Sequence, residues 1–447
     1  MDIRKSKLAP YTIPNLKVYK NGNTRLIGVK SIKWFKIPHR TITIKREGEH
    51  QPIEYTAFNP GSRSHIRKWM EDDYGYTFPY YTEKASVKVD VDSLENMKNP
   101  AGKLLKRYLK VTKDQSQIGG DGGSLLNNYN STTHIVSSRT DTNGTITGRF
   151  TSSSINLNQI PAQKEFRELF TAPEGWSFLG SDFDGQENVI LAELLYPYDN
   201  GRLDRIITSG NKDKGTDLHS LNAKACGVTR SQSKPLWFGF LFGSSPTLTG
   251  YTLLGNDKYT DYTTSEFKAM DKKLKRRVVV LEGAKFYPIR KGTMIPYTDH
   301  VVVQAIFGKH VQEKLVSSTT GLADLIKDLK KKAKENGYLI MPGGRRVQVR
   351  HDHAALNSAT QGGGGEAMKV FLVKVFEATT AAGLIHGRDF KLQATIYDET
   401  DYIVRDECIS TLRYAILSAY TATSRYLGMK CTFTGEVLVG KTWQDCH

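Results

Sequence analysis

The sequence predicts an α+β protein in which one sheet is assembled from segments that lie far apart along the chain. An apolar run at 176–180 leads into acidic residues, and an alternating hairpin at 391–405 has a second acidic tip. Between them, from about residue 200 to 350, the pattern is mostly helical. We therefore expect a sheet domain with a helical insertion between its two sequence segments.

Length and composition are those of a large globular protein. The chain has 447 residues, of which 38% are hydrophobic, and no apolar run reaches about 18 residues, so a transmembrane helix is not expected. The first residues lack the apolar stretch of a signal peptide, and we expect an intracellular protein. The four cysteines show no C-x-x-C spacing, which argues against a zinc site or a disulfide framework.

The chain is strongly basic, with a net charge of +17 and a pI of about 9.4. Basic clusters occur at 272–277 and 327–332, and the first 50 residues carry 12 Lys/Arg against 3 Asp/Glu. Any single run is also compatible with a solvated helix face. The excess over the whole chain predicts a polyanionic partner, and nucleic acid is the natural candidate.

The expected elements follow from periodicity and turn residues. Residues 1–55 contain short β-like runs such as Thr41–Ile44, and residues 115–132, rich in Gly, Ser and Asn, indicate a loop. We predict helices at 64–72, 92–112, 216–226, 230–243, 264–290, 301–337, 353–380 and 406–427, and another one directly after Asp182. We predict strands at 176–180, 391–397 and 401–405, and two short strands joined by the turn Pro342-Gly343-Gly344.

The two acidic strand ends are the main chemical signal. Asp182 follows the buried run, and Asp398 stands beside Glu399 at the hairpin tip. Mg²⁺ takes a few carboxylates plus phosphate oxygens, and two ions about 3.5–4 Å apart can activate a hydroxyl and stabilise a leaving oxygen. We predict that Asp182 and Asp398 hold two Mg²⁺ ions; the alternative is a pair of solvent-facing turn carboxylates.

A helix between these strands carries cations and then aromatics at a spacing of four. Arg230, Lys234, Phe238 and Phe242 drift slowly around one helix face, with Gly243 beside the last ring. Such a face can hold a triphosphate at one end and stack a base at the other. The alternative is an amphipathic helix with cationic ends.

Three further polar residues stand near these motifs. His219 lies just upstream of the cationic helix; a lone histidine also fits a structural role. Asn357 and Gln361 form an i, i+4 amide pair. Amides can donate to the minor-groove acceptors common to all base pairs, although helix-surface hydrogen bonding is the favoured explanation for the pair taken alone.

Together these pieces resemble family A DNA polymerases, in particular the replicative polymerases of T-seven-type bacteriophages. The likeness covers most of the chain from about residue 57 onward, and the order and spacing of its fragments are specific. The fragments are Phe58–Arg63, Thr147-Gly148-Arg149, Asn156–Pro161, Asp182, Asp217-Leu218-His219, the R-x-x-x-K helix with Phe238–Gly243, His353–Asn357, Tyr397-Asp398-Glu399 and Trp443–His447.

The resemblance implies a right-hand polymerase with an antiparallel palm sheet, helical fingers and a reduced or partial thumb. Residues 1–56 would form a basic N-terminal arm or partial thumb, and 57–200 the thumb base and first palm segment. Residues 201–350 would form the fingers, and 351–447 the second palm segment.

The resemblance also implies roles for single residues. Asp182 and Asp398 would bind both metals with the carbonyl of Phe183, and Glu399 would be a supporting acid near the primer end. His219, Arg230 and Lys234 would contact the triphosphate. The remaining roles are base stacking by Phe238, exclusion of a 2′-hydroxyl by Glu187, and contacts to primer–template DNA by Arg149, His353, Asn357, Gln361, Phe242 and Gly243.

Three positions depart from the family pattern. Tyr397 stands where the family usually has histidine. Pro235 follows Lys234, so we expect the helix to start near 231–233 or to kink there. Phe238 replaces the tyrosine of the phage relatives, and we expect stronger rejection of dideoxynucleotides because no phenol hydroxyl can stand in for the missing 3′-OH.

The expected activity is template-directed addition of dNTPs to a primer 3′ end, in the cytoplasm of an infected bacterial host. Only about 56 residues precede the first matching block, and we expect a separate chain to carry an exonuclease and a thumb. No membrane partner is expected. The alternatives are an enzyme like the single-subunit RNA polymerases, or a non-catalytic DNA-binding subunit that kept the fold.

Overall fold

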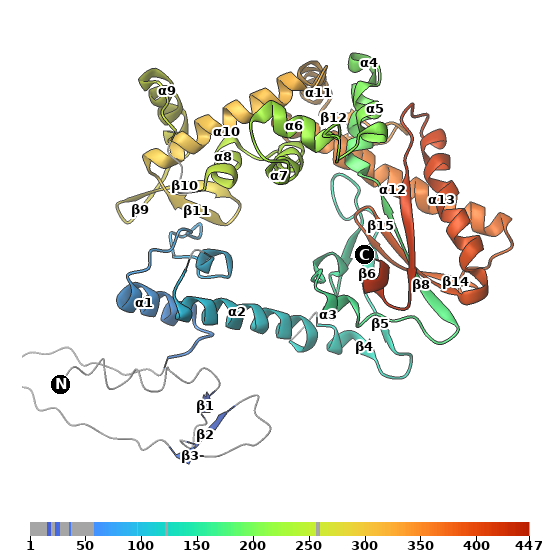
Figure 1. Cartoon of the computed structure of the whole chain (residues 1–447), viewed down its shortest axis with the longest axis horizontal. Coiled ribbons are helices and arrows are strands. Elements are labelled where there is room, and N and C mark those ends of the chain that lie inside the picture. Colours follow the sequence, from blue (N-terminus) through green and yellow to red (C-terminus); the bar gives the residue numbers. More distant parts are fainter. Residues whose placement is uncertain are drawn as a thin grey trace, which may run out of the picture. The chain divides into compact units, whose positions relative to one another are not determined.

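A computed structural model describes residues 58–95, 97–120, 124–255 and 260–446, together with the backbone of three short strands before them (Figure 1). These strands, β1 (Leu16–Val18), β2 (Asn23–Leu26) and β3 (Phe35–Lys36), form one antiparallel sheet. The rest of the predicted arm at 1–56, including Thr41–Ile44, lies outside the described residues. The chain divides into two compact units, one made of 1–77 and 89–109, the other of 78–88 and 110–447.

The first unit contains α1 (Arg63–Tyr74), η3 (Asp92–Leu94) and the beginning of α2 (Pro100–Gly119). The helix predicted at 64–72 is confirmed. The helix predicted at 92–112 is wrong in its start, because Asn99 accepts the Gly102 N–H at 2.6 Å and proline follows at the first helical position. At its other end α2 continues to Gly119, into the segment predicted as a loop.

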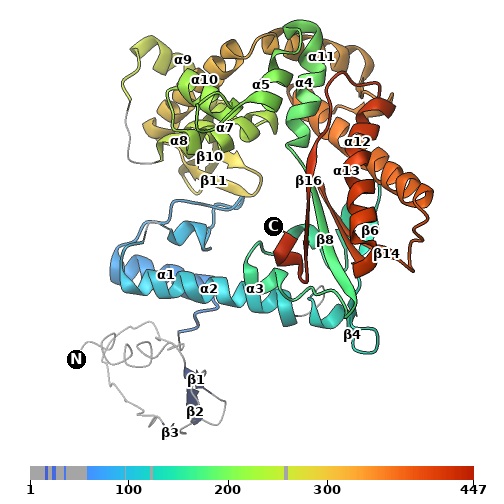
Figure 2. The same cartoon turned by 45° about the vertical axis from the view of Figure 1, so that its right-hand side comes forward.

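The centre of the second unit is a four-stranded antiparallel sheet in the order β14-β15-β8-β16 (Figure 1 and Figure 2). Its strands are β8 (Trp176–Phe183), β14 (Phe390–Ile396), β15 (Glu399–Arg405) and β16 (Gly435–Gly440). Three of them confirm the predicted strands, and the structure adds β16. The sheet therefore joins segments more than 200 residues apart, as the sequence predicts.

Two long helices, α12 (Ala355–Ala381) and α13 (Ile409–Tyr426), lie side by side against this sheet (Figure 2). Phe183 makes edge contacts with Phe371, Tyr420 and Phe433, and these rings fill the core. Helix α12 also contains four consecutive glycines. A Cβ at Gly365 would lie 2.9 Å from the Thr147 carbonyl oxygen, so the glycine is required for the close approach of that backbone.

The region between the sheet segments is helical, except for one sheet that the sequence did not predict. The helix predicted at 264–290 ends at Lys275, and the rest forms the antiparallel strands β9 (Val279–Leu281), β10 (Ala284–Arg290) and β11 (Thr293–Pro296). The β-branched run 278–280 favours a strand, and the turn at Glu282-Gly283 has positive φ at both residues. The segment predicted as helical at 301–337 forms two helices, which Gly321 separates at φ 76°.

The predicted helices at 216–226, 230–243, 353–380 and 406–427 are confirmed, and the predicted turn at Pro342–Gly344 joins two short strands. The remaining helices are α3 (Lys164–Arg167), α4 (Gln186–Asp199), α5 (Arg202–Ser209), α6 (Leu218–Cys226), α7 (Arg230–Leu241), α8 (Pro246–Leu254), α9 (Thr264–Lys275), α10 (Asp299–Ser318) and α11 (Leu322–Asn336). The remaining short strands are β4 (Tyr129–Asn130), β5 (Ile135–Val136), β6 (Arg139–Asp141), β7 (Thr151–Ser153), β12 (Tyr338–Ile340) and β13 (Arg346–Gln348). The remaining 3-10 turns are η4 (Leu126–Asn128), η5 (Leu157–Gln159), η6 (Asp352–Ala354), η7 (Asp406–Cys408) and η8 (Trp443–Cys446). Within the described part of the chain, no helix combines the length and the apolar character needed to cross a bilayer.

Candidate active site

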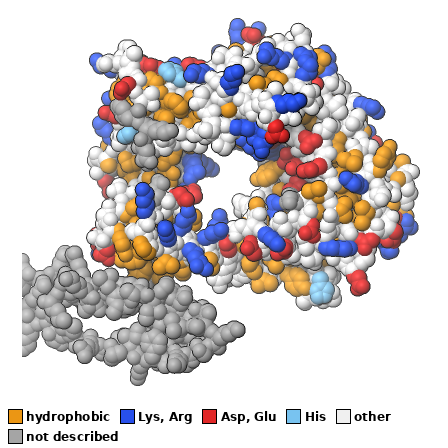
Figure 3. All heavy atoms as spheres, viewed as in Figure 1, with side chains coloured by type: hydrophobic (Ala, Val, Ile, Leu, Met, Phe, Trp, Pro, Cys, Tyr) orange, Lys and Arg blue, Asp and Glu red, His pale blue; other side chains and the backbone are white. Residues whose placement is uncertain are grey.

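The predicted metal-binding residues Asp182 and Asp398 lie at the same end of the four-stranded sheet. Strand β15 runs antiparallel to β8 with Glu399 opposite Asp182, and the Phe183 N–H donates to the Asp398 carbonyl at 3.3 Å. Asp398 itself stands in the two-residue turn between β14 and β15. Acidic side chains gather over this part of the sheet, with Lys and Arg side chains beside them (Figure 3).

Burial and mutual repulsion disfavour two ionised carboxylates here. Burial raises the pKa of Asp182 to about 7, and the charges of Asp398 and Glu399 contribute. Burial also raises the pKa of Asp398 to about 6, with a further contribution from Glu187. A bound cation would relieve this repulsion, so the electrostatics of the site favour a positive ligand.

These residues fit a magnesium ion that takes only part of its shell from the protein. No cluster of three or more His, Cys, Asp or Glu suited to a metal occurs within the described residues. The protein ligands would be Asp182, Asp398 and the Phe183 carbonyl, which already accepts the Gly185 N–H at 2.7 Å and keeps a second lone pair. Magnesium commonly completes such a set with water and phosphate oxygens.

Glu399 is held by Trp443, which belongs to a fragment of the family resemblance but received no role from the sequence. The Trp443 indole N–H donates to Glu399 Oε1 at 2.8 Å, and the buried indole packs against Arg167 and Phe170. Asp401 is buried on the same strand, and burial and Glu399 raise its pKa well above the ordinary value. The i, i+2 spacing of Glu399 and Asp401 on a strand was a usable signal, because it puts both on one face.

Glu187, the predicted sugar-gate residue, forms an ion pair with Arg149 in which both side chains are largely buried. The turn before Arg149 is clamped from two elements: Lys369 Nζ donates to the Gly148 carbonyl and Arg345 Nη1 to the Thr147 carbonyl, each at 2.7 Å. The sequence predicts that Arg149 contacts DNA. The structure places it against Glu187, whose charge also acts on Asp398.

Tyr397, the residue that departs from the family pattern, occupies the hairpin turn in a left-handed conformation with φ 55°. A non-glycine residue rarely adopts this conformation, which costs on the order of 1 kcal/mol. Its ring is half exposed, and the Arg149 guanidinium lies 5.6 Å from the ring centroid. Tyr397 therefore makes a cation–π contact with Arg149 at the end of the sheet that carries Asp182 and Asp398.

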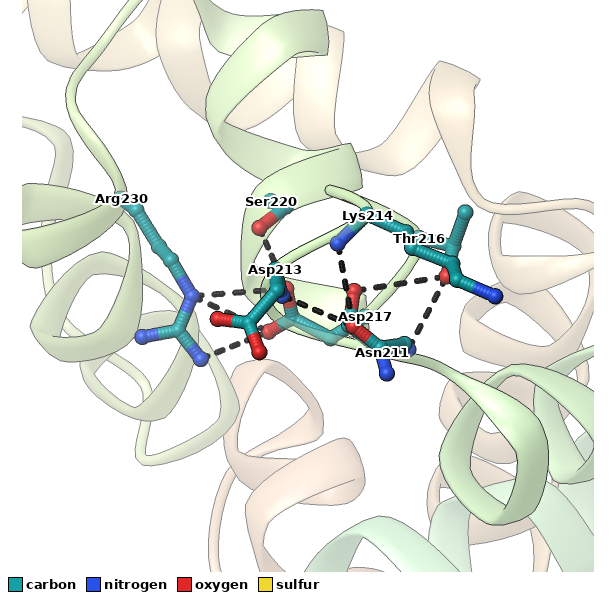
Figure 4. Close-up of polar contacts among 7 residues, drawn as sticks. All are labelled: Asn211, Asp213, Lys214, Thr216, Asp217, Ser220 and Arg230. Carbon is teal, nitrogen blue, oxygen red and sulfur yellow. Dashed lines mark hydrogen bonds and ion pairs between the residues drawn. The ribbon is translucent and has the colours of Figure 1, made fainter.

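The residues predicted to bind the triphosphate, His219, Arg230 and Lys234, lie on the consecutive helices α6 and α7. Arg230 Nη2 donates to Asp217 Oδ2 at 2.8 Å, and Figure 4 shows the guanidinium facing this carboxylate. The hydrogen bond from Arg230 lowers the pKa of Asp217 to about 2. In this structure Arg230 is thus paired with a carboxylate of the protein itself.

Helix α7 starts one residue before the range 231–233 that Pro235 suggested, and the alternative of a kink at the proline stays a prediction. Helix α7 begins at Arg230, because Thr229 and Gln232 form a reciprocal capping box that fixes its first turn. Pro235 lies inside the helix, within its second turn. The capping box therefore keeps Arg230 and Lys234 on one continuous helix despite the proline.

Aromatic rings extend from this cationic end along α7. The His219 and Phe238 ring centroids are 6.0 Å apart, and those of Phe238 and Phe242 are 6.1 Å apart. Burial, Arg230 and Lys234 lower the pKa of His219, which favours a neutral imidazole.

One hydrogen bond ties α7 to the helix that follows Asp182. The Trp237 indole N–H donates to Asn188 Oδ1 at 2.8 Å, and both side chains are buried. Phe238 follows Trp237 in sequence and Glu187 precedes Asn188, so this bond links the backbone at the predicted stacking residue to the backbone at the predicted sugar-gate residue. Sequence reasoning missed both partners, because a buried Trp–Asn pair leaves no periodic pattern.

The predicted DNA-contacting residues of α12 lie at and before its N-terminal end. The His353 ring stacks on His351 at 5.3 Å, and Asn357 and Gln361 are half-buried. Gln361 directly precedes the glycine run, where a Cβ at Gly364 would lie 2.4 Å from the Gln186 side chain. The structure thus connects this end of α12 with α4, while a contact to DNA stays a prediction.

Comparison with known sequences assigns the family. The sequence profile described as DNA polymerase family A matches residues 39–276, more than half of the 447 residues. This chain belongs to DNA polymerase family A. The resemblance drawn from the motifs is therefore confirmed at the level of the family.

Individual relatives agree with this family assignment. The chain is similar to the DNA-directed DNA polymerases of Enterobacteria phage T3 (27% identity over 421 residues) and Escherichia phage T7 (27% over 424 residues). Each alignment covers 89% of this chain and 54% of the phage protein, so this chain spans about half the length of the curated relatives it matches.

A solved structure supports the family A fold. The POL domain of Pol1 from M. smegmatis, in complex with DNA primer-template and dNTP, superposes with a TM-score of 0.60 at 21% identity. The superposition covers 87% of this chain and 62% of that one. It confirms the predicted mixed helix and sheet fold with an antiparallel sheet.

Proposed function

We propose that this chain is a template-directed DNA polymerase that adds dNTPs to the 3′ end of a primer. The observation that carries the proposal is the strand register that pairs Glu399 with Asp182 and sets the Asp398 turn beside Phe183. This register assembles three carboxylates from two distant segments at one sheet end. Membership in DNA polymerase family A supports the same conclusion.

We infer that Asp182 and Asp398 hold two Mg²⁺ ions. Bound there, the ions would lower the pKa of the primer 3′-hydroxyl and stabilise the leaving oxygen of the triphosphate. The residues of the chain supply the two carboxylates and orient them through the β8–β15 pairing. The Trp443 hydrogen bond to Glu399 orients the third acid beside them.

We propose that the α6–α7 residues bind the incoming nucleotide. Arg230 and Lys234 would bind phosphate oxygens, and His219, neutral at pH 7, would donate one hydrogen bond. Phe238 would stack on the base, and Glu187 would fill the space that a 2′-hydroxyl needs. His353, Asn357, Gln361, Phe242 and Gly243 would contact the primer–template.

Primer extension with Mg²⁺ and dNTPs tests the proposal. Asp182→Asn and Asp398→Asn should each lower the rate at least about a thousandfold, because several kcal/mol of charge stabilisation are lost. Asp213→Asn, which changes an exposed carboxylate, is the matched control and should keep the wild-type rate. If both variants extend the primer at the wild-type rate, Asp182 and Asp398 do not catalyse the reaction. The alternative, a non-catalytic DNA-binding subunit, would then be favoured.

Two finer expectations have their own measurements. A preference for dNTPs over NTPs of at least tenfold would separate this enzyme from one like the single-subunit RNA polymerases, and Glu187→Ala should weaken that preference.

The separate chain with exonuclease and thumb stays a prediction. Long processive synthesis by this chain alone, with no stimulation by added proteins of the infected host, would contradict it.

A further inference from the structure

One face of helix α12 contacts the turn that precedes Arg149. Gly365 and Lys369 stand four residues apart on this helix, so they lie one above the other on the same face. A Cβ at Gly365 would lie 2.9 Å from the Thr147 carbonyl oxygen and 3.2 Å from the Arg149 backbone nitrogen, so the bare helix backbone meets the turn there. One helical turn further on, Lys369 Nζ donates to the Gly148 carbonyl at 2.7 Å. The helix thus contacts three consecutive residues, 147 to 149.

A second cation holds the neighbouring carbonyl. Arg345 Nη1 donates to the Thr147 carbonyl at 2.7 Å, and Nη2 donates to Asn143 Oδ1 at 3.1 Å. The backbone of Arg345 is tied to α12 as well, because its N–H donates to Glu366 Oε1 at 3.1 Å. Two successive carbonyls are therefore held from one helix, the second directly by Lys369 and the first through Arg345.

The bonds inside the turn involve its N–H groups. The Gly148 N–H donates to the Thr145 carbonyl and the Arg149 N–H to Thr145 Oγ1, each at 2.9 Å. Gly148 has a φ of 77°, a conformation that favours glycine. Because the carbonyls of this turn accept from side chains of other elements, its orientation depends on those side chains as well as on its own bonds.

The side chain of Arg149 passes the orientation of the turn on to Glu187. The two side chains form an ion pair and are only 16% and 10% exposed. The Arg149 guanidinium also lies 5.6 Å from the centroid of the Tyr397 ring. A largely buried ion pair stabilises its partners only in good geometry, because the attraction must offset the cost of removing both charges from water. A displacement of the turn would therefore also displace the Glu187 carboxylate.

We propose that Lys369 is a positioning residue for the choice between dNTPs and NTPs. It acts through the turn, Arg149 and Glu187 rather than on the nucleotide itself. The inference rests on the proposed polymerase function and on the proposed role of Glu187 in filling the space of a 2′-hydroxyl. Without the Lys369 hydrogen bond, the turn and the Arg149–Glu187 pair shift together, and the enzyme discriminates less against the 2′-hydroxyl.

The ratio of kcat/KM for dNTPs to kcat/KM for NTPs, measured by primer extension with the whole chain, tests this inference. Lys369→Met keeps the length of the side chain and removes the donor. It should lower the ratio by about three- to tenfold, as for the loss of one hydrogen bond. Lys369→Arg keeps a cationic donor and should restore most of the ratio. A purely structural role would lower both kcat/KM values together and leave the ratio unchanged.

The matched control is a second lysine of the same helix. Lys374 Nζ donates to Glu377 Oε2 at 2.7 Å and lies 4.6 Å from the centroid of the Tyr426 ring, and its side chain is 19% exposed. Lys374→Met therefore also removes a hydrogen-bonded, largely buried cation from α12. It should leave the ratio at the wild-type value.

A double variant tests whether Lys369 acts through Glu187. Glu187→Ala removes the side chain that is proposed to exclude the 2′-hydroxyl. Two residues that act through one pathway have non-additive effects. Glu187→Ala/Lys369→Met should therefore show the same ratio as Glu187→Ala alone.

Hydrogen exchange provides a readout that needs no catalysis. The backbone amides of Gly148 and Arg149 should exchange faster in Lys369→Met than in wild type, because the turn opens more often. Their exchange should stay at the wild-type rate in Lys374→Met. The inference is overturned if exchange is unchanged in Lys369→Met, if the ratio is unchanged, or if both kcat/KM values fall by the same factor. An equal loss of the ratio with and without Glu187 would also overturn it.

The inference and the proposed function can fail separately. Asp182→Asn does not change Lys369 or the turn, and its effect is on the rate of extension. A Lys369 effect on the ratio together with full extension by Asp182→Asn would refute the proposed function of the carboxylates only. Loss of extension in Asp182→Asn without a Lys369 effect on the ratio would refute the inference only.

Discussion

The carboxylate end of the sheet and the α6–α7 site handle charge in opposite ways. At the sheet end, Asp182 and Asp398 lie among other acids, and their pKa values rise to about 7 and about 6. At α6–α7, Asp217 is paired with Arg230, and its pKa falls to about 2. The sheet end keeps an excess of negative charge, which Arg149 offsets only in part at Asp398, whereas Asp217 is balanced by its ion pair with Arg230.

The difference indicates what each site needs from its ligands. A metal ion would add an attraction at the sheet end that no described protein cation supplies to Asp182. A triphosphate bound as proposed would compete with Asp217 for the Arg230 guanidinium, so phosphate binding would include the partial release of an existing ion pair. We therefore expect mutations to act on catalysis at the first site and on nucleotide affinity at the second.

The largest effect on nucleotide use should come from Arg230→Gln. Loss of a charge-assisted phosphate contact should lower kcat/KM for dNTPs by about 10- to 100-fold, mainly through KM. Arg205→Gln, which changes a cation bound to the Asn200 carbonyl, is the control and should leave both constants unchanged. Steady-state primer extension measures them. An unchanged KM in Arg230→Gln would show that Arg230 pairs with Asp217 and does not contact the nucleotide.

The second prediction concerns the far end of the same helix face. Phe238→Tyr should raise the incorporation of dideoxynucleotides relative to dNTPs by about tenfold, because a phenol hydroxyl supplies one hydrogen bond in place of the 3′-OH. Phe240→Tyr places a hydroxyl on the same helix two residues away and should leave the ratio unchanged. Wild-type enzyme that already uses both nucleotides equally would refute the prediction.

The sequence predicted the parts of the fold that depend on local patterns. The hairpin at 391–405 and the strand ending at Asp182 have apolar alternation and turn signals, and both were found. The strands β9–β11 were missed because the lysines before and within them fit a helix surface as well as a hairpin. Their β-branched run at 278–280 was the better signal.

Partners across the fold could not be predicted in the same way. The pairs Arg149–Glu187, Arg230–Asp217 and Trp237–Asn188 form between segments that local periodicity treats separately. Family motifs located Arg149 and Glu187 but not their contact. A residue type at a fixed spacing predicts a role, whereas the ion pair that modifies that role depends on packing.

A third prediction tests the support of the acidic site. Trp443→Phe removes the N–H that holds Glu399 and keeps most of the ring packing against Phe170. We expect kcat to fall by about three- to tenfold with KM for dNTPs nearly unchanged, as for the loss of one hydrogen bond of about 1 kcal/mol. Trp69→Phe, in the other compact unit, is the control. A rise in KM without a change in kcat would place Trp443 in nucleotide binding instead.

The smallest expected effect, and the most direct test of the charge contrast, is in stability against pH. The pKa of Asp217 is lower in the folded chain than its ordinary value of 3.8, so its pairing stabilises the fold above about pH 4. That contribution disappears as the pH falls from about 4 to 2. Asp217→Asn should lower the free energy of unfolding at pH 7 by about 1 kcal/mol and flatten the profile below pH 4.

Asp182 should show the opposite slope in the same experiment with EDTA present. Its pKa is raised to about 7 in the folded chain, so the fold binds an extra proton between about pH 4 and 7 and loses stability as the pH rises through that window. Asp182→Asn should remove this loss, leaving the variant at least as stable as wild type at pH 7. Chemical denaturation of the three proteins at several pH values measures both slopes. If the two aspartates change the slope of unfolding free energy against pH in the same direction, the two sites do not differ in how they balance charge.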